Sequence, residues 1–134
     1  MYEYKGTIRR VIDGDTLVID VDLGFHVHTV VHVRLAGINA PETRGEERAL
    51  GKAATRALED FLVDIVATLH DAPTSLQAYS EMAEGRGCPC VLRSFKGRSF
   101  TRWVANVDVL PLSGEPVNVG AWMVENGHAE LAKR

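Results

Sequence analysis

The strongest constraint on the fold is a regular alternation of apolar and polar residues near the N-terminus. Residues 5–12, 16–23 and 26–36 alternate in this way, and Asp13-Gly14 separates the first two runs. Alternation places every second side chain on one face of a β-strand, and Asp-Gly between two such runs is a common hairpin signal. The three runs therefore predict a three-stranded antiparallel meander.

The middle of the chain predicts one long helix and two further strands. Residues 46–63 repeat apolar positions at helical spacing, whereas residues 90–95 and 101–110 alternate again. The apolar stripe of the helix consists of Leu50, Ala54, Ala57, Leu58, Phe61 and Leu62. We expect this helix to pack over the open end of a barrel. Residues 76–82 predict one short strand between glycine- and proline-rich loops.

The end of the chain predicts a short helix over residues 119–125, which Asn126-Gly127 would terminate as a C-cap pair. Five strands in meander order with a helix after the third match an oligonucleotide/oligosaccharide-binding (OB) barrel. The expected fold is α+β, mainly β: a five-stranded OB-fold barrel with one main helix after strand 3 and a short C-terminal helix. With 134 residues and 46% hydrophobic content, the chain should form a single domain over residues 1–134.

No segment is apolar over the length needed to cross a bilayer, and the chain opens without the basic and apolar stretches of a secretory signal. We therefore expect no membrane contact and an intracellular location, cytoplasmic or otherwise.

Two segments carry residues suited to phosphodiester chemistry, Val-Ile-Asp-Gly-Asp-Thr at 11–16 and Val-Arg-Leu-Ala-Gly-Ile-Asn-Ala-Pro-Glu-Thr at 33–43. Asp15, the amide oxygen of Asn39 and a backbone carbonyl near Ala40 are oxygen ligands of the kind that hard divalent cations prefer. Glu42 could take the proton of the attacking water or hold that water in line. Arg34 offers a planar fork of donors to the phosphoryl oxygens.

Purely structural explanations exist for both segments. Asp13-Gly14 could serve as turn residues alone. Pro41 could reverse the chain before the helix, with Thr43 as an N-cap residue paired with Glu46. Such turns are compatible with chemistry by the same side chains.

The order of these motifs resembles the staphylococcal nuclease-like (thermonuclease) family. The paired segments at 11–16 and 33–43 are followed by an alanine-rich helix, and the similarity resumes at Arg102-Trp103-Val104-Ala105. It ends with Val117-Asn118 and with Trp-Met-Val-Glu-Asn-Gly-His-Ala at 122–129. About two thirds of the chain is covered, and residues 66–97 have no counterpart.

The resemblance implies a calcium site and a water-activating carboxylate. Asp15, Asn39 and the backbone carbonyl of Ala40 would hold Ca²⁺, and Mg²⁺ or Mn²⁺ could occupy the same oxygen site. Glu42 would be the general base or water-positioning group, with Asp13 as a nearby supporting carboxylate. The family usually has aspartate where this chain has Asn39, so weaker calcium affinity is expected.

The resemblance also implies two phosphate-binding arginines, Arg34 and Arg102. Phe100 falls where the family tends to carry a tyrosine that packs against the nucleotide. Because the usual Tyr-Gly-Arg has become Phe100-Thr101-Arg102, Arg98 and Arg93 compete with Arg102 for this role. The implied reaction is hydrolysis of DNA and RNA at the 5′ P–O bond, which leaves 3′-phosphate ends.

The family normally continues into another helix after the last strand, whereas this sequence stops at Arg134. Either the core is completed differently, or a second copy of the chain or another partner covers the place of that helix.

Charge both opposes and supports nucleic-acid binding. The net charge is −3 and the pI is about 5.9, which is unusual for a protein that neutralises phosphates. Between Glu84 and Asp108, however, there is no acidic residue, and basic and aromatic side chains alternate. This strip contains Arg86, Arg93, Phe95, Lys96, Arg98, Phe100, Arg102 and Trp103. It could bind single strands by charge and stacking, or it could be a solvated loop with exposed arginines.

The cysteines and clustered histidines favour structural roles. Cys88 and Cys90 are too close in sequence for a relaxed disulfide and too few for zinc, which predicts reduced thiols in a loop. His26, His28 and His32 share a face of the third alternating run with Arg34. A solvent-facing strand is favoured there over a metal site.

Two functions remain open at this stage. The first is a calcium-dependent nuclease acting on DNA or RNA, with single strands preferred. The second is a catalytically silent OB-fold module that binds nucleic acid or a protein partner. The retention of Asp15, Arg34 and Glu42 favours the enzyme.

Overall fold

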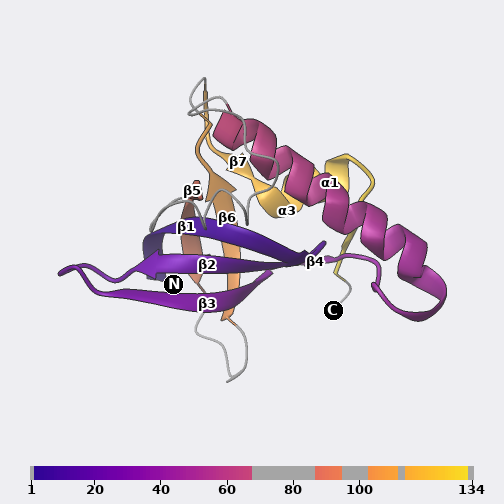
Figure 1. Cartoon of the computed structure of the whole chain (residues 1–134), viewed down its shortest axis with the longest axis horizontal. Coiled ribbons are helices and arrows are strands. Elements are labelled where there is room, and N and C mark those ends of the chain that lie inside the picture. Colours follow the sequence, from indigo (N-terminus) through magenta and orange to yellow (C-terminus); the bar gives the residue numbers. More distant parts are fainter. Residues whose placement is uncertain (1, 68–86, 95–102, 112–113, 133–134) are drawn as a thin grey trace.

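The computed structural model describes residues 2–67, 87–94, 103–111 and 114–132. Figure 1 shows the arrangement of its elements. In chain order they are β1 (Tyr2–Asp13), β2 (Thr16–Asp22), β3 (His28–Leu35), β4 (Ile38–Asn39), a 3-10 turn (Gly45–Glu47), α1 (Arg48–Ala67), β5 (Cys88–Ser94), β6 (Trp103–Val109), β7 (Val117–Asn118), α3 (Val119–Glu125) and β8 (Glu130–Leu131). The strand predicted over residues 76–82 lies outside the described residues.

Five strands close into a mixed barrel. β1, β2 and β3 form the predicted antiparallel meander, in which Ile8 pairs with Ile19 and Val18 with His32. β5 then pairs with β1, and β6 pairs antiparallel with β5 and parallel with β3, which closes the ring (Figure 1). The OB-like α+β barrel is therefore confirmed. The expected meander order is wrong for the last two strands, because β6 lies between β5 and β3.

Helix α1 covers one end of the barrel, as predicted. Its buried side chains join those of β1, β2, β3, β5 and β6 in one core. The helix contributes Ala54, Leu58, Leu62, Ile65 and Val66. Leu50, however, does not join this core, because its side chain is 65% exposed. Within the described segments, no helix has both the length and the apolar character of a membrane span.

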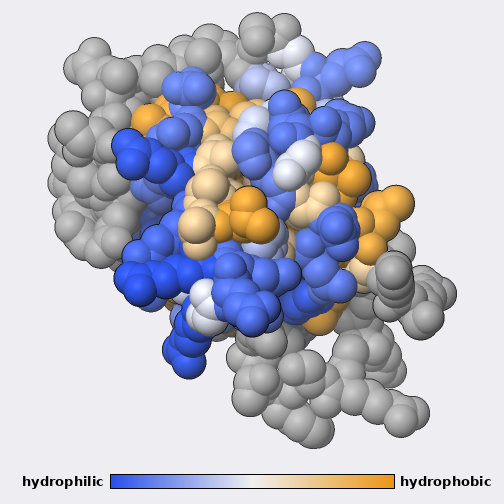
Figure 2. Space-filling view, turned by 90° about the vertical axis from the view of Figure 1, so that its right-hand side faces the viewer, coloured by the Kyte–Doolittle hydropathy of each residue, from blue (hydrophilic) through white to orange (hydrophobic). Residues whose placement is uncertain are grey.

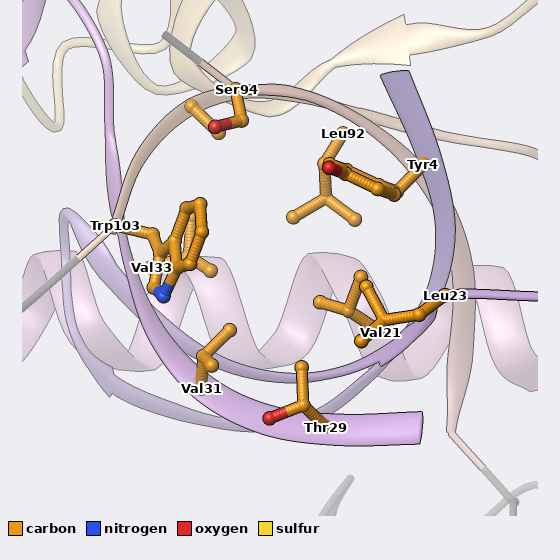
Figure 3. A pocket seen from close by; sticks show the side chains of 10 residues that line it. Tyr4, Val21, Leu23, Thr29, Val31, Val33, Leu92, Ser94 and Trp103 are labelled. Carbon is orange, nitrogen blue, oxygen red and sulfur yellow. The ribbon is translucent and has the colours of Figure 1, made fainter. Parts of the chain in front are cut away.

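The barrel interior opens into a small apolar cavity of about 40 Å³ at the end away from α1. Figure 3 looks into this opening, with side chains from all five barrel strands directed inward and α1 passing behind the ring. Tyr4, Leu92 and Trp103 are among its lining residues. At this size the cavity is part of the packing of the barrel.

The short helix α3 has the predicted boundaries and the predicted C-cap. At its start, the Asn118 side chain accepts a hydrogen bond from Ala121 N–H at 2.8 Å. At its end, Gly127 adopts a left-handed conformation with φ of +77°. Glycine suits this position because it has no Cβ to clash there. The Asn126-Gly127 C-cap is therefore confirmed.

Cys88 and Cys90 lie in strand β5, not in a loop. Both side chains point to the same face, and both are buried in the core as free thiols. The alternation of β5 begins earlier than its sequence suggested, because Pro89 occupies a strand position opposite Thr7. Burial raises the pKa of the Cys88 thiol to about 12, and it also raises the pKa of Cys90.

We expect neither thiol to react with Ellman's reagent in the folded protein at pH 8, and both to react once the chain is unfolded in guanidinium. Reaction requires the thiolate, which the folded protein disfavours. In the unfolded chain the thiols ionise near the ordinary value of 9.0. The free energy of unfolding should therefore fall as the pH rises above about 9. Rapid labelling of the native protein at pH 8 would contradict the buried placement.

Candidate active site

An open cleft of about 440 Å³ contains five of the predicted site residues. Asp15, Arg34, Asn39, Ala40 and Glu42 all line it, although they come from the β1–β2 turn, from β3 and from the segment around β4. Its other lining residues are Pro41, Glu47, Leu50, Gly127, His128, Ala129 and Glu130. Figure 2 faces the side of the molecule where β4 and the start of α1 lie. There, hydrophilic side chains surround small apolar patches.

Asp15 connects the segment 11–16 to the segment 33–43 through hydrogen bonds. Its Oδ2 accepts a hydrogen bond from Ala40 N–H at 3.1 Å, and its Oδ1 accepts one from the Thr16 hydroxyl at 3.1 Å. Its backbone carbonyl accepts a hydrogen bond from Leu35 N–H at 2.8 Å. A carboxylate has about four lone-pair positions, so these bonds leave acceptor capacity for a cation or a substrate donor.

Gly14 allows the β1–β2 turn to lie close to Ala40, for a reason that the turn motif alone did not indicate. Its φ is not positive, so left-handed turn geometry does not require a glycine here. A Cβ at Gly14 would lie 2.7 Å from the Cβ of Ala40 and 3.1 Å from that of Ala54. The glycine therefore lets the β1–β2 turn contact both the Ala40 segment and α1.

Asp13 supports Asp15 and does not itself line the cleft. Its Oδ1 accepts a hydrogen bond from Asp15 N–H at 3.0 Å. Burial raises the pKa of the half-buried Asp13 carboxyl above its usual value. The side-chain hydrogen bond and the negative charge of Asp15 add to this rise, while the Asp15 N–H counteracts it. Asp13 therefore contacts the backbone of a cleft residue without lining the cleft itself.

Arg34 is anchored through one of its guanidinium nitrogens. Nη2 donates to Asn39 Oδ1 at 2.5 Å and to the Ile38 carbonyl at 3.3 Å, and it lies 3.7 Å from Asp15 Oδ2. Within the described residues, Nη1 and Nε make no hydrogen bond or ion pair. An arginine held in this way can present its remaining donors to an anion in the cleft.

Glu42 lies at the cleft on a segment whose backbone binds the Glu47 side chain. Its N–H donates to Glu47 Oε2 at 3.0 Å, and its side chain is exposed. The predicted N-cap role of Thr43 is wrong. The 3-10 turn begins after Arg44 without a side-chain cap, and the Glu47 carboxylate binds the preceding backbone instead.

The donor set fits a hard cation bound with modest affinity. Asp15, Asn39 and Ala40 line one cleft and offer only oxygen ligands, the kind that calcium takes. Among the residues that the structure describes, no group of three or more His, Cys, Asp or Glu side chains could hold a metal ion. Asp15 alone supplies carboxylate charge among these three residues.

Several predicted residues either fall outside the part of the chain that the structure describes or are described away from this cleft. Arg102, Phe100, Arg98 and Lys96 lie outside the described residues, as do Arg86 and Phe95. Arg93 is described, and the suggestion that it binds phosphate in this site is wrong. Its Nε bonds Glu3 at 3.1 Å and its Nη1 bonds Asp108 at 3.0 Å, and it is not among the cleft residues.

The histidines of β3 face solvent, as the favoured interpretation held. His28 and His32 are exposed, and His28 Nδ1 lies 3.1 Å from Asp20 Oδ1. They are separate from the cleft lining.

Sequence reasoning did not place seven of the lining residues in the site, among them Glu47, Leu50, His128 and Glu130. The apolar stripe of the predicted helix included Leu50 at its start. The stripe alone cannot show that the first turn of α1 extends beyond the core, where Leu50 reaches the cleft. His128 directly follows the C-cap glycine, a position that helix termination fixes in space. Nothing in the sequence placed that position beside Asp15.

Comparison of the sequence with protein-family models and with curated proteins found no match. The interpretation of the cleft therefore depends on its own geometry.

Gly51→Ala should displace the Glu42 segment and lower the free energy of unfolding. An added Cβ would overlap the Glu42 carbonyl oxygen and would lie 2.8 Å from Thr43 N. We expect this overpacking to lower the free energy of unfolding by about 1–3 kcal/mol. In an exposed helix without such crowding, replacing glycine by alanine normally raises the stability by about 1 kcal/mol. Urea denaturation measures the change. Gly114→Ala is the control, because an added Cβ there meets no atom within 4 Å. Equal stability of the two variants would show that the close approach is absent.

Proposed function

We propose that this chain is a calcium-dependent phosphodiesterase that hydrolyses DNA or RNA, with single strands preferred. The observation that carries the proposal is the meeting of Asp15, Arg34, Asn39, Ala40 and Glu42 in one open cleft. These residues come from separate segments of the chain. Roles in local turns alone do not account for their meeting at one cleft.

The chain's own residues suit distinct parts of the reaction. Asp15, Asn39 and the Ala40 carbonyl would hold the cation, which when bound supplies Lewis-acid charge to the phosphoryl group. Glu42 is exposed and can accept the proton of an attacking water. Arg34 can direct to the phosphoryl oxygens the donors that make no bond with the described residues, and the charge of these oxygens is greatest in the transition state.

The second candidate is a silent binding barrel, and one contact favours it. The Arg34 guanidinium donates to Asn39 Oδ1 at 2.5 Å, so it engages an oxygen proposed as a cation ligand. If a cation cannot compete with this contact, the cleft would bind nucleic acid or a protein without cutting.

The test of the proposed function is cleavage of heat-denatured DNA and of RNA by the purified protein, with added calcium and with chelator. Cleavage that requires calcium supports the enzyme. Binding without cleavage at millimolar calcium, magnesium or manganese would exclude the enzyme and leave the silent barrel.

Asn39→Asp should tighten calcium binding about tenfold, because an added charge near the cation contributes roughly 1–2 kcal/mol at a partly solvated site. Calorimetric titration with calcium measures the change. Asn106→Asp adds the same charge on β6 outside the cleft lining and should leave the affinity unchanged. Identical calcium affinity in the wild type and in Asn39→Asp would remove Asn39 from the ligand set.

A further inference from the structure

His128 lines the cleft beside the proposed catalytic residues and has no part in the mechanism above. We propose that its imidazole ring forms a nucleobase-binding subsite, on which a base stacks while the adjoining phosphate lies toward Arg34. This inference rests on the proposed function, because it identifies the part of the substrate that the cleft wall formed by residues 127–130 recognises.

The backbone of His128 is fixed from both sides. Toward α3, its N–H donates to the Met123 carbonyl at 2.8 Å, and Gly127 N–H donates to the Val124 carbonyl at 3.1 Å. This pair of bonds is a Schellman motif, which sets the direction of the chain after the helix. Beyond His128, strand β8 pairs with β4, so that Glu130 lies opposite Asn39.

The ring of His128 is also braced. Its centroid lies 5.7 Å from that of Trp122, at an interplanar angle of 32°. Trp122 in turn stacks on Phe61 of α1, with centroids 4.1 Å apart and planes 12° apart. The three rings form a continuous aromatic column from α1 to the cleft wall. A side chain held in this way loses little conformational freedom when a ligand binds.

The charges around His128 favour stacking over a second phosphate contact. Four carboxylates line the same cleft, from Asp15, Glu42, Glu47 and Glu130, against the single arginine among the described lining residues. Stacking of a neutral base does not depend on that balance. Leu50 adds apolar surface from α1, which explains why this exposed leucine lies at the cleft.

A stacking subsite would also select single-stranded substrates. In a duplex the bases are paired and stacked on one another, so they reach an aromatic side chain only after unstacking. Bases of a single strand can turn outward without this cost. The preference for single strands would then arise at His128.

The experiment measures binding of two fluorescein-labelled probes by anisotropy in the presence of chelator, where the proposed enzyme does not cut. One probe is a thymidine pentanucleotide, and the other is a pentamer of the same backbone with tetrahydrofuran in place of every base. His128→Ala should weaken binding of the thymidine probe roughly tenfold, the usual effect of removing a stacking ring. It should leave binding of the abasic probe unchanged. His128→Phe keeps the ring and should bind within about twofold of the wild type.

His32→Ala removes an exposed histidine of β3 outside the cleft and should change neither affinity. Equal loss in His128→Phe and His128→Ala would assign the contact to a ring nitrogen and overturn the stacking subsite. Equal affinity of the wild type for the two probes would also overturn it. Cleavage with calcium, measured in parallel, separates the two proposals. Base-dependent binding without cleavage would contradict the proposed enzyme alone. Cleavage without base dependence would contradict the subsite alone. A wild type that binds neither probe and does not cut would contradict both.

Discussion

Glu42→Gln should lower calcium-dependent cleavage roughly 100- to 10,000-fold, the range that a general base contributes. Glutamine has nearly the same shape, but its amide cannot take a proton from water. The substitution should not disturb the fold, because the Glu42 side chain is exposed and the Glu42 backbone, not its carboxylate, binds Glu47. Initial rates on a labelled single strand at saturating calcium measure the effect.

Binding separates this loss from a general failure of the site. The affinity of Glu42→Gln for the same strand should stay within about twofold of the wild type, since the role proposed for Glu42 is on the attacking water and its side chain offers phosphate no positive charge. Glu46→Gln is the matched control, because Glu46 is an exposed acid in the neighbouring turn that does not line the cleft. Unchanged turnover in Glu42→Gln would remove Glu42 from the mechanism.

The elements that sequence predicted well are those with a local cause. Alternation over residues 5–36 depends on side chains facing a common core, and the end of α3 depends on a glycine two residues after the helix. The closure of the barrel has no local cause. β6 lies beside β3 because the parallel pairing of Val33 with Trp103 joins segments 70 positions apart in the chain, and alternation carries no information about which strands pair.

The candidate site shows the same division. The residue types at Asp15, Arg34 and Glu42 suggested phosphodiester chemistry, which stays a proposal, and the structure brings these residues to one cleft. The glycines that permit this meeting were not interpretable in advance. Gly51 lies in α1, where alanine would be the better helix former, and only its contact with the Glu42 backbone explains it. Contacts between distant segments determine such positions.

Arg34→Lys should lower kcat about 100- to 1,000-fold, the range seen when one donor to a developing anion is removed. Lysine keeps the positive charge beside Asp15 but has no planar fork, so it cannot contact Asn39 and the phosphoryl oxygens together. The fold should tolerate the change. The Arg34–Asp15 pair is 3.7 Å long and the arginine side chain is 29% exposed, and such pairs contribute only about 0–1 kcal/mol.

The division of the effect between kcat and KM tests where Arg34 acts. If its donors bind the transition state more strongly than the substrate, kcat falls and KM changes little. Arg93→Lys is the matched control, since Arg93 is likewise an arginine paired with acidic side chains, those of Glu3 and Asp108, but lies outside the cleft. It should cleave at the wild-type rate. A rise in KM alone for Arg34→Lys would make this arginine a substrate-binding residue, and a wild-type rate in that variant would mean that Arg34 serves only to hold Asn39 and Asp15 in place.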